Sequence, residues 1–159
     1  MSSRIRADQQ VQAGVTGALA GPPTGYLLNL AHRYARAAAN RALRAHGIDL
    51  RHVGVLAYLA QAGPASQRAL AAALQLDKSS MVYVIDELER QGLAERQRTR
   101  QDRRSHAVRI TSAGEKRLRS AGATASAAME ELLAPFSPAE RGQLDELLSR
   151  FVDHARQRG

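Results

Sequence analysis

Two amphipathic segments near the middle of the chain, separated by only three residues, constrain the fold more than any other feature. Ser66 can cap a short helix over QRALAAAL, and Asp77 can cap a second helix that ends near residue 91. The apolar residues of the second segment recur at the spacing of a buried helical stripe: Met81, Val84, Ile85 and Leu88. A short helix, a tight turn and a longer helix follow the plan of a helix-turn-helix.

The segment that follows predicts a β-hairpin with a strongly charged tip. LAERQR (93–98) and HAVRI (106–110) are each typical of a short strand, and a polar stretch joins them. Residues 96–109 contain six arginines and a single aspartate, Asp102. Because so many neighbouring cations repel one another, we expect the hairpin to face a polyanion. Asp102 can form a fork with Arg104 and fix the direction of that side chain.

Two further helices precede this region. Residues 24–46 have helical spacing of apolar residues, with Thr24 as the expected N-cap and Gly47 as a left-handed C-cap. Asp49 is the expected cap of the next helix, which ends before the GP pair at 63–64. We place its apolar side on Leu50, Val53, Leu56, Ala57 and Ala60.

Two more helices follow the hairpin. Ser112, with Glu115 three positions later, predicts a capping box for a helix that ends near residue 134. SPAE at 137–140 has a Ser cap, a Pro at the first helical position and a Glu at the third, and it begins a helix that ends near residue 156. Six helices and one hairpin predict a mainly α fold with a small β-hairpin.

The composition excludes several classes of function. The 159 residues include no cysteine, which excludes disulfides, thiolate metal sites and cysteine nucleophiles. Catalytic motifs and metal-ligand spacings are absent, so we expect no enzyme activity, no metal and no cofactor. No apolar run is long enough to span a membrane and no signal-peptide pattern is present, so we expect a cytoplasmic protein without a membrane partner. The net charge of +8, from 23 Lys and Arg against 15 Asp and Glu, favours nucleic acid as partner.

The exposed face of the second helix is the predicted DNA-reading surface. Its N-terminal amides, with Lys78 and Ser79, suit phosphate, and Val82 and the Tyr83 ring suit a thymine methyl group in the major groove. A basic hairpin beside such a helix can place arginines in the adjacent minor groove. The expected DNA-contacting residues are Lys78, Ser79, Ser80, Val82 and Tyr83 on the helix, and Arg96, Arg98, Arg100, Asp102, Arg103 and Arg104 on the hairpin.

Residues 77–118 resemble the recognition helix and wing of the MarR family of transcriptional regulators. The matching marks are Asp77-Lys78-Ser79, Leu88-Glu89, Gly92-Leu93, Arg96, Asp102-x-Arg104 and the segment from Ile110-Thr111 to Gly114. The similarity extends from about Tyr26 to the segment FSPAERGQLDELLSRF. The chain departs from the family pattern at Tyr83, where many relatives have arginine, and at Ala69, where an acidic capping partner is common.

The resemblance implies a winged helix-turn-helix homodimer that binds a pseudo-palindromic operator in double-stranded DNA. Residues 24–48 and 112–157 would supply the dimerisation helices, residues 49–111 the DNA-binding lobe, and residues 1–23 a weakly patterned N-terminal extension. The resemblance also implies a small-molecule effector, an aromatic acid or a phenol, that releases a repressor from its operator. The candidate effector-binding residues are Asn29, His32, Arg33, Arg36 and His52.

Other interpretations of the same residues remain open. An architectural DNA-binding protein would use the same arginines but would bind all sequences alike, with a steep salt dependence. A protein-interaction module would direct the hairpin at an acidic partner, and a charged tip can also be only a solvated turn. A metal-sensing regulator would need a site built from histidines and carboxylates alone. Tyr83 and the two serines beside it favour reading of the DNA groove.

Overall fold

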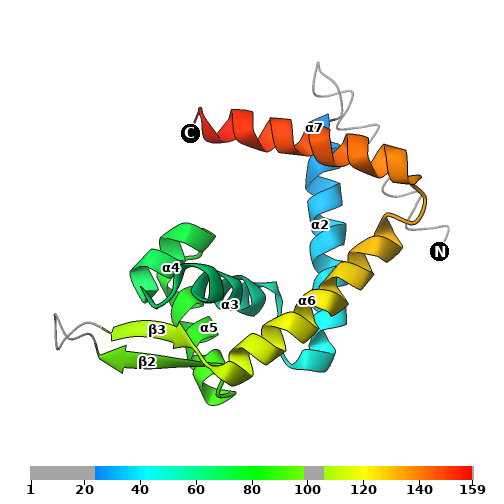
Figure 1. Cartoon of the computed structure of the whole chain (residues 1–159). Coiled ribbons are helices and arrows are strands. Elements are labelled where there is room, and N and C mark those ends of the chain that lie inside the picture. The colour runs from blue at the N-terminus through cyan, green and yellow to red at the C-terminus, as the bar shows by residue number, and fades with distance from the viewer. Residues whose placement is uncertain (1–23, 99–105, 159) are drawn as a thin grey trace. The chain divides into compact units, whose positions relative to one another are not determined.

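The computed structural model describes residues 24–98 and 106–158 (Figure 1). By its internal contacts the chain divides into two units, residues 1–38 and residues 39–159. Over the described residues there are six α-helices and a three-stranded sheet, so the predicted mainly α fold with a small hairpin is confirmed. The predicted N-terminal extension (1–23) and the hairpin tip (99–105) lie outside the described residues.

α2 (Thr24–Leu43) includes Thr24, so the prediction that this residue caps the helix is wrong. A short 3₁₀ turn, η1 (Arg44–His46), follows α2, and Gly47 ends it in the left-handed conformation with a φ of 67°, as predicted. Asp49 then caps α3 (Leu50–Ala62), accepting hydrogen bonds from the backbone N–H groups of Arg51 and His52. These caps satisfy backbone groups that would otherwise be left without partners at the helix ends.

The predicted helix-turn-helix is present in the second unit. Ser66 caps α4 (Gln67–Leu74), because its hydroxyl accepts a hydrogen bond from the Ala69 N–H. The N-cap is therefore formed although Ala69 replaces the acidic residue that is common at this position. Gln75 ends α4 in the left-handed region with a φ of 52°, and Asp77 caps α5 (Lys78–Arg90). The left-handed residue turns the chain sharply enough for the two helices to pack against each other.

β2 (Ala94–Arg98) and β3 (His106–Ile110) pair antiparallel, which confirms the predicted hairpin, and the structure places Glu95 opposite Arg109. A third strand was not predicted: β1 (Ala65–Ser66) pairs with β3, so the strand order is β1-β3-β2. Two residues are too few to show the alternation that identifies a strand in a sequence. This short pairing attaches the hairpin to the start of α4.

The predicted capping box of α6 (Ser112–Leu132) is wrong, because the cap is Thr111. The Thr111 hydroxyl accepts a hydrogen bond from the Gly114 N–H at 3.0 Å and donates one to the Gly92 carbonyl at 2.7 Å. This second bond ties the end of β3 to the turn before β2, which places Thr111 at the start of the helix and Ser112 inside it. The predicted capping box of α7 (Pro138–Arg156), formed by Ser137 and Glu140, is confirmed.

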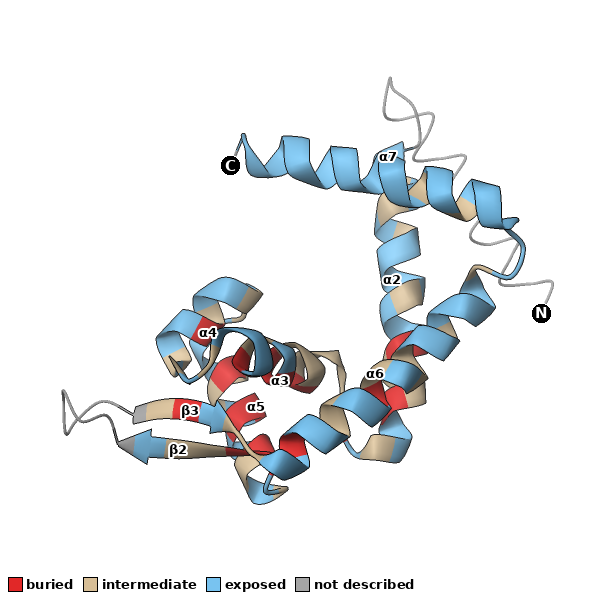
Figure 2. Ribbon diagram, in the orientation of Figure 1, coloured by how far each residue is buried: buried red, intermediate tan, exposed pale blue. Residues whose placement is uncertain are grey.

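The core lies among α3, α4, α5 and β3, where the buried residues gather in Figure 2. The α5 stripe is buried as predicted, with Val84, Ile85 and Leu88 fully enclosed. The predicted apolar side of α3 is partly wrong, because Ala57 and Ala60 are exposed. The buried residues of this helix are His52, Val55, Leu56 and Leu59. α7 contains no buried residue.

Candidate nucleic-acid interface

The N-terminal turn of α5 presents polar groups to solvent. Asp77 accepts hydrogen bonds from the Ser80 N–H at 2.9 Å and from the Ser80 hydroxyl at 2.6 Å, and these bonds lower the pKa of Asp77. The cap therefore holds the Ser80 side chain, which is half-buried, while Lys78 and Ser79 are exposed. The free N–H groups and the positive end of the helix dipole at this turn favour an anion such as phosphate.

The middle of the same helix presents one large side chain to solvent. Tyr83 is 59% exposed although it lies between the buried residues Met81 and Ile85. Val82 beside it is half-buried, and Asp86 one turn later is exposed. The predicted reading residues thus lie on the side of α5 opposite its buried stripe, as a helix that enters a groove requires.

Arg96 does not extend freely from the hairpin. Its guanidinium forms ion pairs with Glu89 and, at 2.5 Å, with Asp86, both on α5, and the Glu89 carboxylate also accepts the Arg96 backbone N–H at 2.7 Å. Its side chain is only 24% exposed. These bonds attach β2 to α5, so Arg96 fixes the hairpin beside the helix. Because two carboxylates compensate its charge, Arg96 is poorly suited to contact a phosphate of DNA.

Arg109 is also compensated, because its Nε donates to Glu95 at 2.6 Å across the hairpin. Arg96 and Arg109 are the first and last of the six arginines in residues 96–109. Both are therefore paired with carboxylates, and these carboxylates lie outside the segment from Arg98 to Arg104. Arg98 is the last residue of β2. Arg100, Asp102, Arg103 and Arg104 lie outside the described residues. Their proposed contacts with DNA stay predictions.

Sequence reasoning missed the residues that support this surface. Arg51, at the start of α3, places its guanidinium 6.0 Å from the centre of the Tyr83 ring. The carboxylates of Asp86 and Glu89 hold Arg96. The signals in the sequence were weak. Asp49 lies two positions before Arg51 at the start of a helix, and Asp86 and Glu89 lie on the last turns of a helix that is followed by a basic strand.

Comparisons with known proteins bear on this arrangement. The MarR family model matches residues 46–105, from the end of η1 to the hairpin. A candidate transcriptional regulatory protein for the hcr operon of Thauera aromatica is 36% identical over 98 residues, which are 62% of this chain. A solved MarR-family transcriptional regulator from Rhodococcus sp. RHA1 is 29% identical, with a TM-score of 0.71 over 80% of this chain and 91% of its own. CouR from Rhodococcus jostii RHA1, solved bound to p-coumaroyl-CoA, is 29% identical, with a TM-score of 0.66 over 80% of this chain and 90% of its own.

The chain is similar to the MarR family over its central residues. It spans 59% of the length of its Thauera relative. The Thauera relative and the Rhodococcus sp. RHA1 structure are both described as transcriptional regulators. None of the helices within the described residues is long and apolar enough to cross a membrane. The same residues contain no cluster of histidines and carboxylates suited to a metal ion.

The candidate effector residues fall into two groups. Asn29, His32, Arg33 and Arg36 are exposed on α2, in the first unit, where the Arg33 guanidinium lies 5.3 Å from the Tyr34 ring centre. His52 belongs to the second unit and is 5% exposed. Its Nδ1 accepts a hydrogen bond from the Asp49 backbone N–H at 3.2 Å, which completes the capping box of α3, and the same nitrogen lies 2.8 Å from Asp49 Oδ1. The structure thus gives His52 a place in a helix cap.

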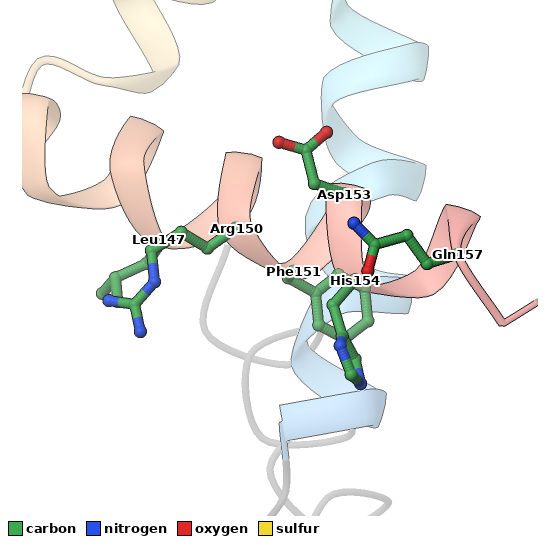
Figure 3. Close-up of a pocket in the computed structure, with 6 residues that line it drawn as sticks. All are labelled: Leu147, Arg150, Phe151, Asp153, His154 and Gln157. Atoms are coloured by element: carbon green, nitrogen blue, oxygen red, sulfur yellow. The ribbon is translucent and has the colours of Figure 1, made fainter.

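A hollow on α7 does not include the candidate effector residues (Figure 3). Its lining comes from α7 and from the residue that follows this helix: Leu147, Arg150, Phe151, Asp153, His154 and the C-cap Gln157. A hollow lined by one side of one helix does not enclose a small molecule, since ligand pockets bury most of the ligand surface. Its apolar members, Leu147 and Phe151, are 60% and 55% exposed and belong to the apolar stripe of this helix.

Proposed function

We propose that this protein is a transcriptional regulator that binds double-stranded DNA sequence-specifically through α5 and the β2–β3 hairpin. The observation that carries the proposal is the division of α5 into two faces. One face is buried in the core, and the other presents Lys78, Ser79 and Tyr83 beside a hairpin fixed to the same helix by Arg96. Base edges would meet Tyr83 and Val82, while phosphates would meet the N-terminal turn and the remaining arginines of the hairpin.

We infer that the regulator is a homodimer whose contact includes α7. This helix has apolar residues at helical spacing and no buried residue, and Leu147 and Phe151 are more than half exposed. A contiguous exposed apolar stripe of this kind is typical of an interface, and a second copy of the chain offers the same stripe. Two copies would present two α5 helices to half-sites about one helical turn apart, which predicts a pseudo-palindromic operator.

We further propose that the protein is a repressor released by an aromatic acid or phenolic effector. CouR, a similar protein, was solved bound to p-coumaroyl-CoA. In this chain the exposed cations and polar groups of α2 (Asn29, His32, Arg33 and Arg36) are suited to a carboxylate or phenolate. His52 is less suited, because a ligand would have to displace its contact with Asp49. A ligand would act only through a different affinity for the DNA-bound and the free arrangement.

Fluorescence anisotropy on two labelled duplexes tests the proposal. One duplex carries DNA from upstream of the protein's own gene, and the other carries the same bases scrambled, each at two salt concentrations. We expect binding to the first duplex to be at least about 10³-fold tighter at physiological salt. Equal binding to both duplexes, falling steeply with salt, would instead support a sequence-blind architectural protein. Aromatic acids added to the specific complex should lower its anisotropy if the effector proposal is right.

A further inference from the structure

Arg51 joins the exposed face of α5 from a neighbouring helix. It is the second residue of α3, and its side chain is 37% exposed. Its Cζ lies 6.0 Å from the centre of the Tyr83 ring, at the outer limit of a cation–π contact. Tyr83 is the largest exposed apolar side chain of α5 and one of the two positions at which this chain departs from the family pattern. A cation beside such a ring restricts the orientations that the ring adopts.

The Arg51 guanidinium is itself held in place. Its Nε and Nη2 both donate to Asp49 Oδ2, at 3.0 Å and 2.6 Å. Asp49 is fixed in turn, because its other oxygen accepts the N–H groups of Arg51 and His52 at the start of α3. A continuous set of contacts therefore runs from the backbone of α3 through Asp49 and Arg51 to the Tyr83 ring. Two donors of one planar guanidinium that bond to the same carboxylate oxygen fix the orientation of an arginine more firmly than that of a lysine.

We propose that Arg51 is a specificity-determining positioning residue, which holds the Tyr83 ring against a thymine methyl group although Arg51 lies outside the helix that enters the groove. This inference rests on the proposed DNA-binding function. A side chain that is ordered before binding loses less conformational freedom when it meets its target. Docking on DNA would also remove water from the Arg51–Tyr83 contact and strengthen it. Tyr83 would then discriminate between thymine and bases without the C5 methyl group.

Replacement of thymine by uracil removes only that methyl group, so it provides a direct test. Each thymine of one half-site of the upstream duplex is replaced in turn, and the ratio of the dissociation constants of the substituted and unsubstituted duplexes is measured. At one position the wild-type protein should bind the uracil duplex about three- to fivefold more weakly, the value of one buried methyl group. Arg51→Ala and Tyr83→Ala should each reduce this ratio below about twofold.

Two further variants separate positioning from charge and from folding. Arg51→Lys keeps the cation but loses the paired donors to Asp49, so it should bind the unsubstituted duplex only as well as the uracil duplex, about three- to fivefold more weakly than wild type binds the unsubstituted one. Arg51→Ala in the Tyr83→Ala background should produce no further change of the ratio, since contacting residues couple in a double-mutant cycle. Arg119→Ala, at an exposed arginine of α6, is the matched control for the loss of one charge and should leave the ratio unchanged.

The outcomes distinguish the two proposals. If the wild-type protein binds upstream and scrambled DNA equally, the proposed function fails and the role of Arg51 fails with it. If binding is specific but uracil has no effect at any position, only the role of Arg51 is overturned. The same holds if Arg51→Ala weakens binding to the thymine and the uracil duplexes by one common factor. A thymine preference that disappears in Arg51→Lys and Tyr83→Ala, with unchanged melting temperatures, supports it.

Discussion

α5 and α7 have the same kind of apolar stripe, but only α5 buries it within the chain. Met81, Val84, Ile85 and Leu88 are at most 1% exposed. On α7, Leu147, Phe151 and Val152 recur at equivalent spacing and are 60%, 55% and 41% exposed. Helical periodicity therefore identifies the face that will be covered, whereas the structure identifies whether the same chain covers it. The chain itself covers the stripe of α5, and we propose that a second copy covers the stripe of α7.

Gly114→Ala is the most severe test of the close packing in the lobe. A Cβ at this buried position of α6 would collide with the Leu93 carbonyl oxygen and lie 2.8 Å from Cγ1 of Ile110. Since the Leu93 carbonyl is a backbone group that accepts the Thr111 N–H, it cannot move without breaking the turn. We expect a loss of at least about 3 kcal/mol in the free energy of unfolding, measured by urea denaturation.

Gly122→Ala is the matched control, because Gly122 lies on the same helix and a Cβ there would have no neighbour within 4 Å. Alanine has the higher helix propensity, so this variant should be as stable as wild type or more stable by up to about 1 kcal/mol. Equal stability of the two variants would contradict the close approach of α6 to the Leu93 carbonyl.

Phe151→Asp tests whether a second copy of the chain covers the exposed apolar stripe of α7. If α7 is covered by a second copy, a carboxylate at this position would be buried in an apolar contact and should weaken association by at least about 30-fold, or about 2 kcal/mol. Sedimentation equilibrium measures this change. The melting of the lobe should be affected far less than the association, because Phe151 is 55% exposed in the chain itself.

Glu146→Ala supplies the control on α7, since Glu146 is exposed and polar. It should leave the mass of the wild-type assembly unchanged. A Phe151→Asp protein with the same mass as wild type at all concentrations would show that the apolar stripe of α7 is not the contact between copies.

Low pH should weaken the start of α3. Partial burial would raise the pKa of Asp49, but hydrogen bonds from Arg51 and His52 and the charge of His52 outweigh it and lower this pKa to about 2. The folded-state pKa lies below the ordinary value of 3.8, so the unfolded chain takes up the proton first. The stabilisation is complete above about pH 4 and is lost as the pH falls toward 2, with a size of at most about 2 kcal/mol.

Denaturation of wild type and Asp49→Asn at pH 7, 4 and 3 measures this contribution. The difference in unfolding free energy between the two proteins should be largest at pH 7 and shrink at pH 3. Asp145→Asn, at an exposed aspartate of α7, should follow the wild-type curve. A constant difference between wild type and Asp49→Asn across this range would contradict the assigned contacts of Asp49.

The elements that were predicted from the sequence are those with strong local signals. The caps Asp49, Ser66, Asp77 and Ser137 were found because each side chain bonds an N–H two or three residues away. Ser112 was misassigned because Thr111 beside it is an equally good cap, and the bond from Thr111 to the Gly92 carbonyl comes from a turn 19 residues earlier. Long-range contacts of this kind leave no periodicity in a sequence.

The candidate site was predictable in outline and not in its supporting contacts. The buried stripe of α5 determined its exposed face, so Lys78, Ser79 and Tyr83 were found correctly as surface residues. The apolar side of α3 was misplaced because Ala57 and Ala60 contribute little to burial, while the buried His52 was interpreted as a ligand residue. The ion pairs of Arg96 join two elements across seven or more residues, and only the folded arrangement brings them together.

The smallest expected effects distinguish Arg104, which we propose contacts DNA, from Arg96, which attaches the hairpin to α5. Arg104 belongs to the proposed wing pair, so Arg104→Ala should weaken binding to the upstream duplex by more than about tenfold without changing the melting temperature. Asp102→Ala should weaken binding less, because Asp102 would act only through Arg104. Arg96 is already paired with Glu89 and Asp86, so Arg96→Ala should instead lower the melting temperature by a few degrees, equivalent to about 1 kcal/mol.

Arg109→Ala completes this series, because Arg109 also has a carboxylate partner but its side chain is 49% exposed, compared with 24% for Arg96. Exposed pairs contribute little, so this variant should melt close to wild type. Anisotropy and thermal melting on the same four proteins separate the two roles. If Arg96→Ala melts like wild type but binds the upstream duplex tenfold more weakly, Arg96 contacts DNA. Other residues would then have to attach the hairpin to α5.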